Sequence, residues 1–132
     1  MNPMNNKWIV CLALALTGCG GSGLGGTWKG EAAGWSVTVV LDESTEQSGT
    51  SYFMGTVSSN KPDCFTNGTA AATLVNGKTA QILSTASGSA SNTTVVDISG
   101  ELSGNTIVGY LEATSAASAC DTDRTPITLT RQ

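Results

Sequence analysis

The chain has 132 residues, of which 12% are charged and 5% aromatic, with 16 glycines, no histidine and a formal net charge of −4. This length suits a single domain. Because histidine is absent, the composition excludes a Ser-His-Asp or Cys-His catalytic relay and every His-ligated metal site. Six Lys and Arg residues against ten Asp and Glu also argue against a nucleic-acid partner, since phosphate binding needs clustered cations.

The first 18 residues have the organisation of a secretory signal peptide. Lys7 and the amino terminus supply positive charge, an apolar run extends from Trp8 to Leu16, and small residues end it. The run is shorter than the roughly 20 residues that a membrane-spanning helix requires. We therefore expect residues 1–18 to be removed as a leader and not to remain as a transmembrane anchor.

The end of this segment, Leu16-Thr17-Gly18-Cys19, resembles the lipobox of bacterial lipoproteins at all four positions. The resemblance implies cleavage between Gly18 and Cys19, followed by acylation of the Cys19 sulfur and of the new amino group. More than one acyl chain gives stable membrane attachment. Position 20 is Gly and not the Asp that retains many such proteins in the inner membrane. The resemblance therefore implies a lipid anchor in the outer membrane with a domain facing the periplasm. The alternative is an ordinary thiol after an ordinary signal peptide.

Four cysteines are present, and two of them remain for the mature domain. Cys11 leaves with the leader and Cys19 is taken by lipid, so Cys64 and Cys120 are left to form one disulfide. Small secreted domains use disulfides because their compartment is oxidising. A reactive thiol is the weaker alternative, because neither cysteine has a His or a C-x-x-C partner.

The mature chain divides into a tether and one domain. Residues Gly20 to Gly26 predict a flexible spacer with a root-mean-square span of about 14 Å. The domain, 27–132, lacks a useful 3.6-residue apolar period and instead has short runs rich in Val, Ile and Thr between turn signals. These runs predict eight strands: Thr27–Glu31, Trp35–Leu41, Tyr52–Ser58, Phe65–Val75, Lys78–Ser84, Thr93–Leu102, Asn105–Ala113 and Pro126–Arg131.

The turns and the alternation of side chains favour a small antiparallel up-and-down β-barrel, with a β-sandwich as the alternative. Asn76-Gly77 and Ser103-Gly104-Asn105 are tight-turn signals that make neighbouring strands antiparallel. Glycines inside the predicted strands, at positions 55, 100 and 109, suit the corners of a closing sheet. Because loops of an up-and-down barrel alternate ends, the loops carrying Cys64 and Cys120 are expected at the same end. The tether and both tight turns are expected at the other.

Gly26-Thr27-Trp28, at the start of the first predicted strand, resembles the G-x-W signature of lipocalins. In that family the Trp plugs one end of the barrel and an Arg near the last strand covers it, which implies that Arg131 lies over Trp28. Without the resemblance, Trp28 is an ordinary core residue. The G-x-W-x-G segment and the ending Cys-Asp-x-Asp followed by Thr-Leu-Thr-Arg are also similar to small uncharacterised bacterial lipoproteins, a class that brings no established activity.

Few residues are candidates for chemistry. Asp63, Asp121 and Asp123 are brought together by the proposed disulfide and are candidate ligands of a metal such as calcium, although calcium prefers six to eight oxygens and solvated loop charges are the simpler interpretation. Four large side chains are either core residues or the lining of a ligand cavity: Trp35, Tyr52, Phe53 and Met54. No carboxylate pair or serine-nucleophile motif stands out, so no cofactor and no catalytic residue are assigned.

The sequence thus predicts a lipid-anchored envelope protein that acts as a noncatalytic binding or structural module. Two alternatives remain: a lipocalin-like carrier of a small apolar ligand, and an inhibitor that binds an envelope-targeting hydrolase through its loops.

Overall fold

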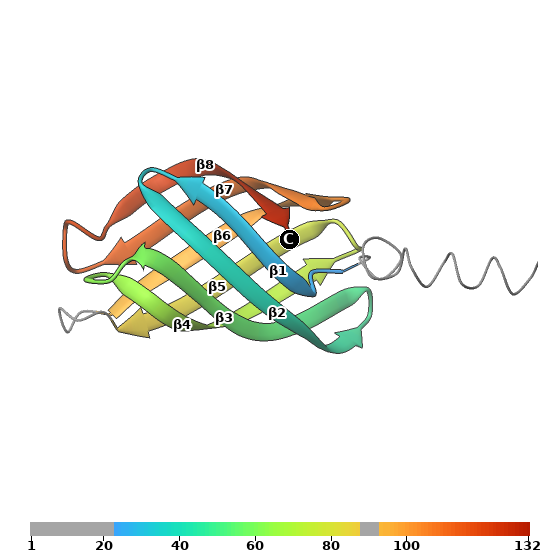
Figure 1. The fold of residues 1–132 in the computed structure, drawn as a ribbon. Coiled ribbons are helices and arrows are strands. Elements are labelled where there is room, and N and C mark those ends of the chain that lie inside the picture. Colours follow the sequence, from blue (N-terminus) through green and yellow to red (C-terminus); the bar gives the residue numbers. More distant parts are fainter. Residues whose placement is uncertain (1–22, 88–92) are drawn as a thin grey trace, which may run out of the picture.

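The computed structural model describes residues 23–87 and 93–132 (Figure 1). The expected signal peptide, the cleavage position at Gly18 and the expected lipidation site Cys19 lie outside these residues. The described part contains eight strands, which follow the sequence as β1 Gly26–Ala32, β2 Trp35–Gln47, β3 Thr50–Lys61, β4 Phe65–Val75, β5 Thr79–Ser87, β6 Thr93–Ser103, β7 Thr106–Ser115 and β8 Thr122–Arg131.

The strands form a closed antiparallel barrel in which each pairs with its neighbours in sequence and β8 returns to β1. This confirms the predicted all-β up-and-down barrel and excludes the sandwich alternative. Closure between β1 and β8 involves only two registered pairs, Trp28 with Arg131 and Lys29 with Thr130. Within residues 23–87 and 93–132, no helix is long and apolar enough to cross a membrane.

The two ends of the barrel differ in what they carry. The tether end has the turns at Ser48-Gly49, Asn76–Lys78 and Gly104-Asn105, together with the first described residues and the carboxyl terminus (Figure 1). The disulfide end has the turn at Ala33-Gly34 and the two loops that hold Cys64 and Cys120. The arrangement confirms that both disulfide loops share an end, opposite the tether and the tight turns.

Side chains alternate between the interior and the solvent along the central part of the strands, as the period of a β-strand requires. In β4, for example, the buried residues are Ala70, Ala72 and Leu74, and the exposed ones are Thr69, Ala71 and Val75. The buried set forms one continuous core whose members expose no more than 8% of their surface. The core is held by a few large side chains, Trp28, Trp35, Phe53 and Phe65, among many small and branched ones.

Glycines at the closest strand crossings allow the sheet to coil into so small a barrel. A Cβ atom added at Gly55 would lie 1.8 Å from the carbonyl oxygen of Val40 on β2. Gly100 and Gly109 are directly paired, and each lies against the backbone of the other's strand. The predicted role of these three glycines as barrel corners agrees with the structure, because any side chain would force the strands apart.

Several strands extend beyond their predicted limits. β2 continues to Gln47, six residues past its predicted end at Leu41, because its ladder with β3 satisfies these backbone groups across a bulge near Glu43. β8 begins at Thr122 and not at Pro126. The backbone amide of Gln132 points toward β1 and donates to the Thr27 carbonyl. Pro126 of β8 lies an even number of residues before Gln132, so its nitrogen, which has no hydrogen to donate, faces the same side. Continuing the register sets Pro126 just beyond the end of β1, where no ladder donor is needed.

Candidate functional site

The tether end of the barrel is closed by Trp28 and Arg131. Trp28 is fully buried, and the Arg131 guanidinium lies 4.2 Å from the centre of its ring. The same guanidinium donates hydrogen bonds to the carbonyl oxygens of Gly23, at 2.8 Å, and Gly25, and to Asn105 Oδ1 at 3.0 Å. Burial lowers the pKa of Arg131 below its ordinary value. The two residues that the G-x-W resemblance paired are therefore in contact.

Leu24 completes this closure and corrects one expectation. The segment Gly20 to Gly26 was expected to be a flexible spacer, but Leu24 is fully buried in the core and its carbonyl accepts a hydrogen bond of 2.8 Å from Trp28 Nε1. Gly26 already belongs to β1. The apolar side chain in a glycine-rich stretch explains the difference, because burying a leucine contributes about 1.5–3 kcal/mol. Residues 20–22 lie outside the described part.

The disulfide end is closed by a second tryptophan and by the disulfide. Cys64 and Cys120 are bonded, with their Cα atoms 5.4 Å apart, which confirms the predicted pair. Trp35 is buried, and its Nε1 donates to Thr122 Oγ1 at 2.9 Å while Lys61 Nζ lies 5.1 Å from its ring centre. Each end of the barrel thus has one tryptophan whose ring is faced by one cation.

The interior between these two plugs is filled by side chains. Among the residues of described burial, two are buried and polar: Ser84 donates to the carbonyl of Thr69 at 3.0 Å, and Thr94 donates to Ser115 Oγ at 3.1 Å. In the described part of the chain, every buried side-chain nitrogen or oxygen has a partner. The interior therefore presents no polar group that awaits a ligand.

The three aspartates do not form a metal site. Asp121 Oδ1 accepts a hydrogen bond of 3.0 Å from the Ser115 amide and so orders the loop that carries Cys120. Throughout the described ranges, no group of three or more His, Cys, Asp or Glu side chains is placed to hold a metal ion. Asp63, Asp121 and Asp123 therefore do not form a three-ligand cluster in this part of the chain, although the disulfide joins the loops next to them.

The four large side chains expected either in the core or around a cavity separate into two pairs. Trp35 and Phe53 are buried, as a core role requires. Tyr52 and Met54 point outward and are exposed, because they flank Phe53 in a strand whose side chains alternate. The expectation for these two residues is wrong, and they belong to the outer surface.

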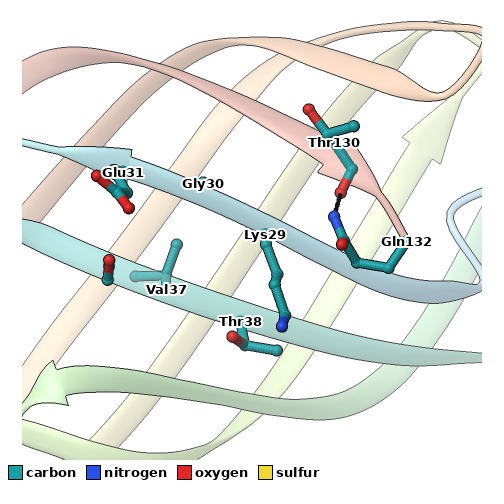
Figure 2. A pocket seen from close by; sticks show the side chains of 8 residues that line it. Lys29, Gly30, Glu31, Val37, Thr38, Thr130 and Gln132 are labelled. Carbon is teal, nitrogen blue, oxygen red and sulfur yellow. Dashed lines mark hydrogen bonds between the residues drawn. The ribbon is translucent and has the colours of Figure 1, made fainter.

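The outer wall has a polar groove of about 460 Å³ over β8, β1 and β2 (Figure 2). Lys29 of β1 lies between Thr38 of β2 and Thr130 of β8 in the strand register, and the side-chain Nε2 of Gln132 donates to the Thr130 carbonyl at 2.8 Å. Glu31 is the one carboxylate that lines the groove. The groove offers hydroxyl and amide groups for a polar contact, but it lacks the carboxylate pair of a glycosidase.

Neither this groove nor a second, apolar hollow on β3, β4 and β5 was predicted from the sequence. A signal for the apolar hollow was present. Tyr52-Phe53-Met54 and Ile82-Leu83 are consecutive apolar residues within strands, so one face of each run must point away from the core.

Comparison of the chain with protein-family models, with curated proteins and with solved structures gives no match. Its fold and its two closed ends define it as a small, disulfide-linked antiparallel β-barrel with a filled interior.

Proposed function

We propose that the mature chain is a lipoprotein of a bacterial cell envelope, anchored through Cys19, whose barrel is a noncatalytic binding module. The observation that carries this proposal is the Leu16-Thr17-Gly18-Cys19 segment after an apolar leader. The disulfide between Cys64 and Cys120 is in keeping with an oxidising compartment outside the cytoplasm. Gly20 favours the outer membrane as the site of the anchor and the periplasm as the location of the barrel.

The module acts through its outer surface in this proposal. A lipocalin-like carrier needs an interior space for its ligand, whereas the described core side chains here are packed against one another with at most 8% exposure. The outer wall, in contrast, carries two hollows and several exposed large apolar side chains. These features favour a protein partner at the wall over a small apolar ligand inside.

The anchor is tested by intact-mass analysis of the chain purified from the membranes of a lipoprotein-processing bacterium. We expect the mass of residues 19–132 increased by acyl groups. Cys19→Ala should leave residues 1–18 attached, because it removes the thiol that accepts the lipid. Globomycin, which blocks the lipoprotein peptidase, should make the precursor of the unaltered chain accumulate.

Cys11→Ala is the matched control, since it removes a cysteine from the same segment outside the lipobox. It should be processed and acylated like the unaltered chain. An unacylated residue 19 in the unaltered chain, or normal processing in the presence of globomycin, contradicts the anchor.

A further inference from the structure

The outer wall of β3, β4 and β5 carries an apolar strip that we define as Tyr52, Met54, Ala71 and Leu83. Tyr52 exposes 39% of its surface, Met54 50% and Leu83 44%. Met54, Ala71 and Leu83 are direct neighbours in the strand register, so they form one row across the sheet. The small Ala71 side chain leaves a hollow of about 230 Å³ between its larger neighbours.

Carboxylates lie at both ends of this row. Asp42 of β2 is paired with Met54, and Asp97 of β6 is paired with Leu83. Glu112 of β7 continues the row beyond Asp97. Four strand spacings separate Asp42 from Asp97, which amounts to about 19 Å along the wall. An apolar hollow is thus flanked on both sides by negative charge.

The cations of the described residues are engaged elsewhere and do not neutralise this row. Arg131, Arg124 and Lys61 face aromatic rings. Lys78 lies 3.9 Å from Glu101, and Lys29 lines the polar groove. Asp97 accepts a hydrogen bond from Gln81 at 3.5 Å, which holds its carboxylate beside the strip.

We propose that the apolar strip docks a basic segment of a partner protein, in which apolar side chains enter the hollow at Ala71 and lysine or arginine side chains reach Asp42 and Asp97. This inference rests on the proposed role of the barrel as a binding module and names the chemistry of its partner. Exposed charge pairs of this kind contribute modestly to affinity but select against partners of the wrong sign.

Two other occupants fit the strip less well. A second copy related by a twofold axis through Ala71 would set Asp42 of one chain against Asp97 of the other, and like charges across an interface oppose association. An anionic membrane surface would meet the same carboxylates and be repelled. A basic segment is the occupant whose charge complements the row.

The spacing of the carboxylates sets the length of the segment. In an extended chain, about 19 Å corresponds to about six residues, so cations at the first and seventh positions reach both carboxylates and point to the same side. The test uses the synthetic peptide Lys-Thr-Leu-Thr-Leu-Thr-Lys and its counterpart with Glu at both ends. Isothermal titration calorimetry against the full-length purified chain should show binding of the basic peptide at least about tenfold tighter than of the acidic one.

Variants with matched controls locate the site. Ala71→Leu fills the hollow and should weaken binding of the basic peptide about tenfold, whereas Thr128→Leu, exposed on β8, should leave it unchanged. Asp42→Asn with Asp97→Asn removes two charges at the strip and should weaken binding about fivefold. Glu31→Gln with Asp123→Asn removes two charges elsewhere and should change it less than about twofold.

Equal or absent binding of the two peptides overturns the proposal, as do site variants that behave like their controls. Sedimentation that shows a dimer lost on Ala71→Leu assigns the strip to self-association and also overturns it. These measurements do not depend on the acylation of Cys19, so their failure is distinguishable from a failure of the proposed anchor.

Discussion

Loss of the disulfide is expected to remove a large part of the barrel's stability. Cys64 and Cys120 are 56 residues apart in sequence, and the bond joins the β3–β4 and β7–β8 loops. In the chain-entropy model, a closed loop of this length restricts the unfolded chain by about 14 cal/mol/K, or about 4 kcal/mol at 25 °C. Domains of this size commonly have 5–15 kcal/mol of total stability, so the reduced barrel keeps only part of it.

The assay is urea unfolding of the purified chain in its oxidised form and after reduction, followed by tryptophan fluorescence. Reduction converts the disulfide into two thiols and keeps both sulfur atoms in place, so the difference in unfolding free energy reports the cross-link and not a cavity. Cys64→Ala with Cys120→Ala should lower the free energy of unfolding by a similar amount, plus a smaller loss from packing, because both side chains are buried and truncation leaves space in the core. The melting temperature should fall by roughly 15–20 °C.

A loss below about 1 kcal/mol in the reduced chain would refute this reasoning. It would mean that the unfolded chain already keeps the two loops close, so the bond removes little freedom from it.

Three further changes test the closure of the barrel. Arg131→Ala should lower the free energy of unfolding in urea by about 2–4 kcal/mol, because it removes the cation over Trp28 and the hydrogen bonds to Gly23 and Gly25. Arg131→Lys should restore only part of this stability. Equal stability of the unaltered chain and the two variants would contradict the prediction. Gly55→Ala should lower the melting temperature far more than Gly104→Ala, because a Cβ at Gly55 overlaps the Val40 carbonyl whereas Gly104 has open space and a positive φ of 61°. Thr122→Val should cost about 1–3 kcal/mol by leaving Trp35 Nε1 without its acceptor, measured as a shift of the urea midpoint, and an unchanged midpoint would show that another group accepts it.

The sequence predicted the barrel because its local signals agree with one another. Asn76 and Gly77 adopt the positive φ angles, 54° and 69°, that their residue types permit at low cost, so this turn was recognisable. β4 was predicted with its observed limits, because a continuous run of strand residues ends at that turn. Ala33 and Ser48 also have positive φ, but neither residue type signals such a turn by itself.

The surface features were harder to predict because they depend on how far strands extend and which way they face. The predicted second strand ended at Leu41, and only its pairing with β3 extends it to Gln47 and places Asp42 beside Met54. Leu24 looked like part of a tether because its neighbours are glycines, and only the closed barrel provides the apolar site that it fills. The length of β2 and the burial of Leu24 both depend on contacts between residues far apart in sequence, and a local sequence pattern does not contain such contacts.

The hydrogen bonds from Arg131 to Gly23 and Gly25 have a mechanical consequence. A pull on the chain ahead of Gly23 is transmitted to the last strand as well as to the first, because Arg131 of β8 is hydrogen-bonded to the segment that leads into β1. The seam between β1 and β8 has only two registered pairs, so these hydrogen bonds add to the contacts that hold its tether end closed. Arg131 thus reinforces the junction of the first and last strands at the end of the barrel where such a pull acts.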